Sequence, residues 1–302
     1  MALVVGCVEL KTAAPAARLR DLGTPGEGRL EDRFERWAER VREVPLKHRI
    51  PLRDLYRGVG WSAIRAIDES REDLDIWVVS AGLGLVPLRL AAPSYGATFS
   101  LGLPDSVGRS REEGRRWWGL HTKSPPLSGV RADARSLRGI AGQYSSVVIA
   151  LSASYLEATC DDVMAAAERG QEVTLVSVGA GSSGFAGERA VRLPASARTV
   201  VGGTLVSLLS RSLDLALSDI PEGEASAQEV RWRLEAIAEL SPDLDQPVRR
   251  PLTDAQLQRQ MSKFLSSNPR LSSSAALARL RAQGFACEAK RFRRIFGSRR
   301  PA

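Results

Sequence analysis

Four short runs of apolar residues, rich in valine and isoleucine, constrain the fold of this chain more than any other feature. None of them shows the alternation of apolar and polar residues that is typical of a half-exposed antiparallel strand. Stretches with helical spacing separate the runs, which indicates a parallel sheet covered by helices on both faces. The sequence therefore predicts an α/β domain with a four-stranded, mostly parallel sheet flanked by helices. The predicted strands are Ala2–Val5, Ile76–Val79, Val147–Leu151 and Val173–Val178.

The segments between these strands carry apolar residues at the spacing of an amphipathic helix. The segment 101–133 differs, because it contains glycines, a Ser124-Pro-Pro sequence and two adjacent tryptophans, and it predicts one long loop. The predicted helices of the α/β domain are Leu30–Val44, Trp61–Arg71, Tyr155–Arg169, Gly202–Leu217 and Ala225–Leu240.

Positive charge is concentrated at the C-terminal end. The 302-residue chain has a net charge of +8, yet 13 basic residues and only two acidic ones lie between Arg249 and Ala302. This segment predicts three short helices, Asp254–Leu265, Ser272–Ala282 and Cys287–Phe296, with Thr253 and either Ser272 or Ser273 as N-caps. We interpret 1–245 as an α/β catalytic domain and 249–302 as a basic module, with a solvated arginine-rich tail as the alternative. The predicted DNA-contacting residues of the module, which resembles a helix-turn-helix, are Arg279, Arg281, Lys290, Arg291, Arg293 and Arg294.

Several function classes find no support in the sequence. Two histidines and three scattered cysteines lack zinc-ligand spacing, although an acidic magnesium site stays open. No phosphate-loop or dinucleotide fingerprint occurs, so no ATP, NAD or flavin is expected, and no serine-hydrolase elbow is present. No apolar stretch approaches the roughly 20 residues of a membrane span, and the N-terminus shows no export signal. The three cysteines are widely spaced and odd in number, so the chain is expected in the cytoplasm. No cofactor, membrane or obligate protein partner is expected.

The residues that follow the predicted strands are small or carry hydroxyl groups. Ligands of doubly wound sheets bind beyond the carboxyl ends of the strands. The four ends together predict one binding crevice, although glycine and serine are also common turn residues. The predicted substrate contacts among these residues are Gly6, Cys7, Ser80, Ser152, Ser182 and Ser183.

Motifs at these strand ends carry a family resemblance over residues 3–215. Cys7 and Lys11 form a Cys-x3-Lys loop, Asp54-Leu55-Tyr56 an Asp-Leu-Tyr motif, and 80–86 a Ser-Ala-x-x-Gly-Leu-Val motif, followed by Pro93-Ser94-Tyr95. This combination resembles a bacterial family related to the uracil-DNA-glycosylase-like fold and to domains that accompany archaeosine transglycosylases. Some members are similar to antiphage DNA glycosylases that remove α-glucosylated hydroxymethylcytosine. An insertion of about thirty residues, Leu19–Arg49, leaves the placement of Lys11 relative to Asp54 open.

The resemblance implies hydrolysis of an N-glycosidic bond through an oxocarbenium-like sugar cation. Asp54 is the candidate carboxylate that stabilises the cation or activates water, with an N-cap of the Trp61 helix as the alternative. Lys11 is expected to contact a phosphate, because nothing in the sequence indicates the lowered pKa that an attacking amine needs. A flipped base is expected to stack on aromatic rings, for which the candidates are Tyr56, Tyr95 and Tyr155; the alternative, which each tyrosine taken singly favours, is a place in the core.

Trp117 and Trp118 are expected to contact DNA from the predicted loop, since Arg115, Arg116 and Lys123 flank them, or to anchor that loop. The leading hypothesis is a metal-independent DNA glycosylase of antiviral defence that leaves an abasic site in double-stranded or single-stranded DNA. The alternatives are a non-catalytic DNA-binding or protection protein and an enzyme that processes free nucleosides.

Overall fold

The computed structural model describes residues 1–22, 28–169, 172–179, 189–242, 250–269 and 271–297. The chain divides into two compact units, Met1–Pro242 and Asp243–Ala302, each with its own hydrophobic core. The predicted division places the first domain at 1–245. In the described part of the chain, no helix combines the length and the apolar character needed to cross a membrane.

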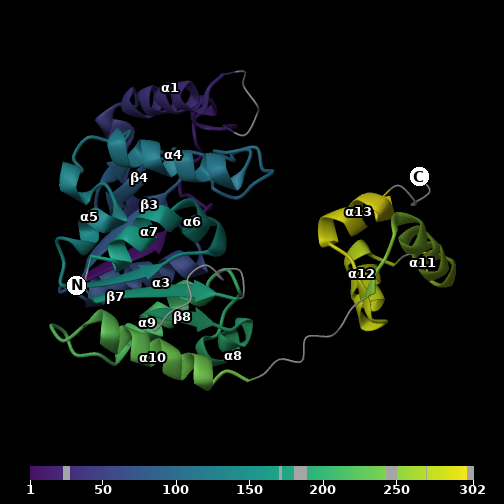
Figure 1. Ribbon diagram of the computed structural model, residues 1–302. Helices are drawn as coiled ribbons and strands as arrows, with labels where there is room; N and C mark the ends of the chain where they lie inside the picture. The colour runs from purple at the N-terminus through teal and green to yellow at the C-terminus, as the bar shows by residue number, and fades with distance from the viewer. Residues whose placement is uncertain (23–27, 170–171, 180–188, 243–249, 270, 298–302) are drawn as a thin grey trace. The chain divides into compact units, whose positions relative to one another are not determined.

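A mixed sheet with helices on both faces forms the centre of the first unit (Figure 1). The sheet has six strands in the order β4-β3-β1-β6-β7-β8, so the prediction of four strands is wrong in number. The four predicted strands are its parallel centre, and β4 joins β3 in antiparallel orientation. The strands are β1 (Ala2–Gly6), β3 (Asp75–Ser80), β4 (Gly84–Pro87), β6 (Ser146–Ala150), β7 (Glu172–Val178) and β8 (Ala190–Leu193).

The two additional strands are short edge strands, which explains why the apolar runs do not reveal them. In β8, Val191 and Leu193 are buried while Arg192 is exposed, so the strand shows alternation over only four residues. β4 follows a tight turn in which Gly84 has a φ of 83°, a conformation that costs other residues energy. A short antiparallel pair also joins β2 (Ile50–Pro51) to β5 (Ala91–Ala92).

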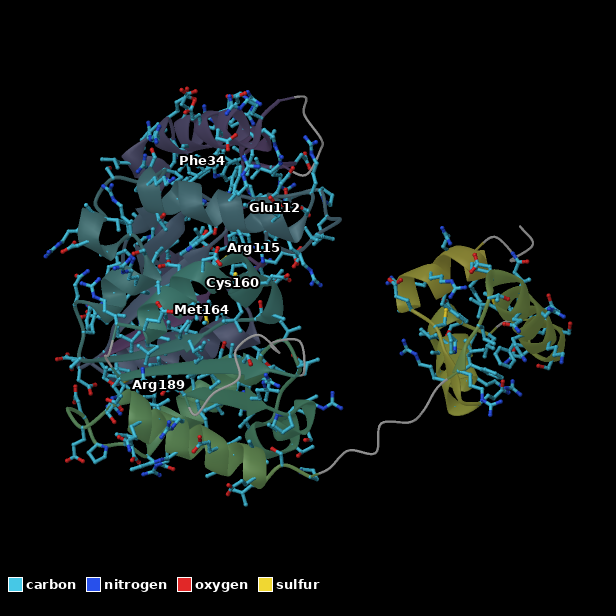
Figure 2. All side chains as sticks on the ribbon, in the orientation of Figure 1. Phe34, Glu112, Arg115, Cys160, Met164 and Arg189 are labelled. Carbon is cyan, nitrogen blue, oxygen red and sulfur yellow. The ribbon has the colours of Figure 1, made fainter. Side chains whose placement is uncertain are left out.

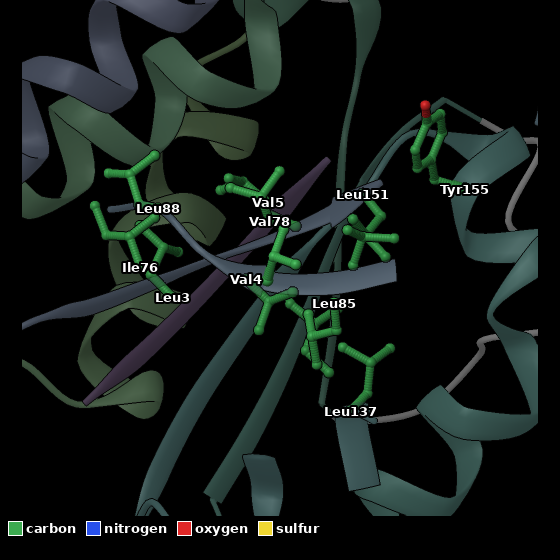
Figure 3. Close-up of a cluster of buried hydrophobic side chains, with 14 of the residues drawn as sticks. Leu3, Val4, Val5, Ile76, Val78, Leu85, Leu88, Leu137, Leu151 and Tyr155 are labelled. Carbon is green, nitrogen blue, oxygen red and sulfur yellow. The ribbon is translucent and has the colours of Figure 1, made fainter. Parts of the chain in front are cut away.

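Valine and leucine side chains from neighbouring strands fill both sides of the sheet. Figure 3 shows Leu3, Ile76 and Leu88 on one side of β1 and Val4 and Leu85 on the other. This two-sided burial is what continuous apolar runs predict for central parallel strands.

The helices form one layer on each face of the sheet. One layer contains α3 (Val59–Ser70), α8 (Arg198–Val201), α9 (Leu208–Ser218) and α10 (Ala227–Glu239). The other contains α4 (Arg111–Lys123), α5 (Leu137–Ala141), α6 (Ala153–Ala158) and α7 (Cys160–Ala167), and α1 (Leu30–Arg42) packs on α4 (Figure 1). The structure has two helices, α6 and α7, where the sequence predicts a single helix over 155–169. The helix α2 (Leu52–Leu55) is a single turn.

The segment 101–133 is not one long loop, because α4 occupies its centre. Ser110 caps α4 by accepting a hydrogen bond from the Glu113 backbone N–H at 3.1 Å. Gly114, Trp117, Trp118 and His121 are buried at helical spacing (0, +3, +4 and +7). Glycines at 114 and 119 and prolines at 125 and 126 hide this pattern, since both residue types disfavour helices.

The described residues of the second unit, 250–269 and 271–297, form three helices and a two-stranded parallel pair. The helices are α11 (Asp254–Ser267), α12 (Ser273–Ala282) and α13 (Ala289–Gly297), and the strands are β9 (Arg250–Pro251) and β10 (Phe285–Ala286). Thr253 and Ser272 cap α11 and α12, which confirms both predicted N-caps. Phe264, Leu280 and Phe292 contribute one side chain from each helix to the core.

Candidate functional site

The candidate site lies where the connections of the sheet change direction. From β1 the chain continues to β3 on one side, and it later returns to β6 on the other side of β1. In doubly wound sheets such a switch point, at the carboxyl ends of the strands, is where ligands bind. Gly6 is the last residue of β1 and Cys7 follows it, and Ser152 lies just after β6.

Three buried hydroxyl groups from separate motifs form one hydrogen-bond network at this edge. The Tyr95 hydroxyl lies 2.5 Å from the Tyr56 hydroxyl and 2.5 Å from Ser80 Oγ. Ser80 Oγ also accepts hydrogen bonds from the backbone N–H groups of Gly82 and Leu83, at 3.2 and 3.0 Å. The Asp-Leu-Tyr motif, the Ser-Ala-x-x-Gly-Leu-Val motif and Tyr95 thus meet at one point.

The loop that carries Lys11 pairs directly with the Asp-Leu-Tyr segment. Lys11 and Tyr56 form an antiparallel bridge, and Arg57 N–H donates to the Leu10 carbonyl at 3.0 Å. The Thr12 hydroxyl donates to the Asp54 carbonyl at 3.0 Å. The insertion 19–49 therefore does not separate Lys11 from Asp54, since a short ladder joins their segments.

Lys11 extends over the aromatic rings of this network. Its Nζ lies 4.5 Å from the Tyr95 ring centroid and 5.4 Å from that of Tyr56, and donates to the Glu9 carbonyl at 3.2 Å. Burial lowers the pKa of the Lys11 ammonium, while Cys7 and the carboxylates of Asp105 and Glu9 act in the opposite direction. The sequence gives no sign of a lowered lysine pKa, because the rings that bury Lys11 lie 45 and 84 residues away.

The tyrosines of the site are buried and do not offer free ring faces. Tyr56, Tyr95 and Tyr155 are 1%, 0% and 8% exposed. The prediction that their rings stack on a flipped base is therefore wrong for this conformation, because protein atoms already cover the rings. Burial first, and the neighbouring Cys7 second, raise the pKa of each phenol well above 10, so all three stay neutral.

Cys7 connects the ends of β1 and β6. Its Sγ lies 3.1 Å from the Tyr155 hydroxyl, and a side chain added at Gly6 would meet Leu151 and Tyr155 at 3.6 and 3.8 Å. In Figure 3 the Tyr155 hydroxyl points away from the side chains around Leu151. Ser152 is exposed beside this contact, whereas Ser182 and Ser183 fall outside the described residues.

Asp54 is exposed on the single turn α2, so its carboxylate is free to meet a ligand. It is not the N-cap of the Trp61 helix, because that position belongs to Gly58, whose φ is 109°. The N-cap alternative is therefore wrong.

A second carboxylate, Asp105, was missed by sequence reasoning. It acts on the Lys11 charge, accepts a hydrogen bond from the Asp21 backbone at 2.8 Å and lies against Gly96. No sequence signal marks Asp105, because only the folding of 96–107 over the network brings it there.

The adjacent tryptophans support the sheet and do not reach solvent. Trp117 is 0% and Trp118 3% exposed, so neither contacts DNA in this conformation. Trp117 Nε1 donates to the Ala81 carbonyl at 2.7 Å, and Trp118 Nε1 donates to Asp162 Oδ2 at 3.0 Å. Neighbouring residues of a helix point about 100° apart, so α4 buries one ring beside α1 and the other against α7.

The basic residues around these tryptophans point in several directions. Arg116 forms an ion pair with Glu31 at 2.6 Å, and Arg115 reaches Cys160 Sγ at 4.0 Å (Figure 2). Lys123 instead lines a hollow of about 480 Å³ together with Arg42, Arg49 and Arg135. The side chains of Arg115, Arg116 and Lys123, all predicted to contact DNA, therefore do not form one continuous surface.

The predicted contacts in the second unit also divide by environment. Arg291 pairs with Asp254 and donates to the Leu252 carbonyl at 2.9 Å, and Arg281 donates to the Cys287 carbonyl at 3.2 Å, so both hold the module together. Arg279 is exposed and lies over the Phe264 ring at 5.1 Å. Arg293 and Arg294 are exposed on α13, and the Lys290 side chain is outside the described set.

Comparisons with protein-family models, with curated proteins and with solved structures find no match for this chain. Among the described residues, no three histidine, cysteine or acidic side chains come together as a metal site. The family resemblance thus rests on the motif residues.

Proposed function

We propose that this protein is a DNA glycosylase that hydrolyses the N-glycosidic bond of a modified pyrimidine. The observation that carries the proposal is the convergence of Cys7, Lys11, Tyr56, Ser80 and Tyr95 on one edge of the sheet. These residues come from four chain segments and are the ones that resemble the glycosylase-related family. Their place at the switch point of the sheet is where a ligand is expected.

The groups at this edge suit a reaction through a cationic sugar. The Asp54 carboxylate is exposed and its segment is paired with the Lys11 loop, so it is available to stabilise an oxocarbenium ion or to orient water. The hydroxyl groups of Tyr56 and Tyr95 bind each other and so hold in place the Tyr56 segment, which pairs with the Lys11 loop. The described site residues need no cofactor for this chemistry.

The direct test is base release from modified DNA. The full chain is incubated with phage DNA that contains α-glucosylated hydroxymethylcytosine, the base to which the resemblance points, and with the same DNA unmodified. We expect free modified base by mass spectrometry and an equal number of abasic sites in the DNA. Binding without release across a panel of modified DNAs would instead support a non-catalytic DNA-binding protein.

The Asp54→Asn variant is expected to lose base release by about 100-fold or more, because it removes the charge but keeps the size of the side chain. Asp32→Asn, an exposed substitution on α1, is the matched control and should retain full activity. Single-turnover rates on the modified DNA measure both. Full activity of Asp54→Asn would exclude Asp54, and Asp105→Asn would then test the second carboxylate.

The basic module is expected to supply affinity through phosphate contacts. The Arg293→Ala variant should lower DNA affinity similarly for all sequences and reduce the salt dependence by about one unit of log Kd against log salt. Arg293 suits this test because its side chain is exposed and its described hydrogen bond is to its own helix, at Ala289. Fluorescence anisotropy at several salt concentrations measures the slope, with Arg131→Ala in the first unit as the control. An unchanged slope would remove Arg293 from the contact surface.

A further inference from the structure

Lys11 differs in its surroundings from the three other lysines whose side chains the structure describes. The chain has five lysines, and Lys47, Lys123 and Lys263 are exposed. Lys11 is partly buried, with its Nζ over the Tyr95 and Tyr56 rings. Within the described part of the chain, its amine forms no ion pair, and one N–H is used by the Glu9 carbonyl. A lysine that only binds phosphate does not need this environment, since an exposed ammonium binds phosphate as a point charge.

The surroundings of Lys11 shift its protonation equilibrium toward the neutral amine. Burial against the tyrosine rings removes water from the ammonium and lowers its pKa, and this outweighs the opposing effect of Cys7 and of the carboxylates of Asp105 and Glu9. A neutral amine is the nucleophilic form, and lysines that attack carbonyl groups are commonly activated by such desolvation. The buried network below Lys11 also fixes the direction of its loop, because Tyr56, Tyr95 and Ser80 bind one another.

We propose that Lys11 is a Schiff-base nucleophile that attacks the aldehyde carbon C1′ of an abasic deoxyribose. The inference rests on the proposed function, which supplies an abasic site beside Lys11, and adds a second reaction at the same edge of the sheet. It replaces the expectation of a simple phosphate contact. The substrate class is an aldehydic sugar held in a nucleic acid chain.

The bonds made and broken in this step balance without a cofactor. The Nζ lone pair of Lys11 forms a bond to C1′ of the open sugar, and the carbonyl oxygen leaves as water. The imine makes the C2′ hydrogen acidic, so a proton passes from C2′ to solvent water. The electrons of that C–H bond form a double bond to C3′, and the 3′ phosphate leaves with the electrons of the C3′–O bond. Hydrolysis of the imine then releases Lys11, and the strand is cut.

The test uses the full chain and an oligonucleotide with one abasic site that was made beforehand by another glycosylase. Sodium cyanoborohydride reduces any Schiff base to a stable secondary amine, so protein and DNA become covalently joined. We expect a trapped adduct on a denaturing gel and, after digestion, mass spectrometry that locates it on Lys11. An adduct on another lysine or on the amine of Met1, or no adduct at all, would overturn the proposal.

Two variants separate chemistry from folding. Lys11→Arg keeps the positive charge but is not an amine nucleophile, and we expect trapping to fall by about 100-fold or more. Lys47→Arg removes an exposed lysine in the same way and should trap as well as the unaltered chain. Because the adduct is mapped on the unaltered chain, the proposal stays testable even if Lys11→Arg unfolds.

The pH dependence of labelling gives an independent readout. Pyridoxal phosphate followed by borohydride labels lysines through the same imine chemistry. The midpoint for Lys11 should lie at lower pH than that for Lys47, because the neutral amine of Lys11 appears earlier as pH rises. Equal midpoints would contradict an activated amine.

The two proposals fail in different ways. The preformed abasic site bypasses base removal, so trapping at Lys11 without base release would reject the glycosylase and keep the Schiff base. Base release without trapping would support the glycosylase and reject the Schiff base.

Discussion

Replacing Gly82 with alanine is expected to destabilise the first unit by about 2–3 kcal/mol and to abolish trapping at Lys11. An alanine Cβ at this position would lie 2.6 and 2.7 Å from two ring atoms of Tyr95. The backbone cannot easily move away, because Gly82 N–H donates to Ser80 Oγ and the Gly82 carbonyl accepts from Trp37 Nε1 at 2.7 Å. The Tyr95 ring must therefore shift, and its bonds to Tyr56 and Ser80 break.

Chemical unfolding followed by tryptophan fluorescence measures this loss. All six tryptophans lie in the first unit, so the signal does not report on the basic module. Gly119→Ala is the matched control: no atom lies within 4 Å of the added carbon and the position is inside α4, so stability should rise by up to about 1 kcal/mol. If Gly82→Ala were as stable as the unaltered chain, the Tyr95 ring would be able to move away from position 82 at little cost in free energy.

The centre of the fold is predictable because its signal is local. A buried parallel strand must be apolar on both faces, and Ala2–Val5 and Val147–Leu151 show this in consecutive residues. Each of the four predicted strands is present. The edge strands β4 and β8 carry only four residues each, and one is polar-faced, so pattern alone does not distinguish them from turns.

The helix α4 is an element that the helix propensities of its residues do not reveal. Its buried stripe has helical spacing, but two glycines and the following prolines favour a loop. Tertiary contacts decide the outcome, since Phe34 packs against the Trp117 ring with centroids 5.0 Å apart. The same contact explains why the Trp117 ring is buried.

The sequence indicates which segments meet at the candidate site but not the geometry in which they meet. Residues after the strand ends come together at one edge, because parallel strands align their carboxyl ends. The contacts between Tyr56 and Tyr95, and the position of Asp105 beside them, depend on loops that return to this edge from far along the chain. The lowered pKa of Lys11 depends on the same return, so no spacing in the sequence indicates it.

Stability of the first unit is expected to fall by about 3 kcal/mol as pH is lowered from 6.5 to 4, because of His121. His121 is 1% exposed, and burial lowers its pKa from 6.5 to about 4, against a smaller opposing effect of the Ala81 carbonyl. Its Nε2 lies 3.0 Å from that carbonyl and donates to it, while Nδ1 has no hydrogen-bond partner among the described residues. The folded state therefore holds a neutral ring that the unfolded chain protonates.

The sign follows from the protons bound in each state. Above pH 6.5 His121 is neutral in both the folded and the unfolded state, so it does not lower the free energy of unfolding. Between pH 6.5 and 4 only the unfolded chain gains the proton, so acid favours unfolding. The loss ends near pH 4, where the folded ring is also protonated. Asp73, whose pKa the Arg71 side chain lowers to about 2, acts below pH 3.8 and so outside this window.

Guanidinium unfolding at several pH values between 7.5 and 4.5 measures this dependence. His121→Gln keeps an N–H donor near the Ala81 carbonyl but does not titrate, so its stability should fall much less over the window than that of the unaltered chain. The chain has one other histidine, the exposed His48, and His48→Gln should retain the full pH dependence. An equal decline in the His121→Gln variant would assign the acid sensitivity to the carboxylates and remove His121 as its cause.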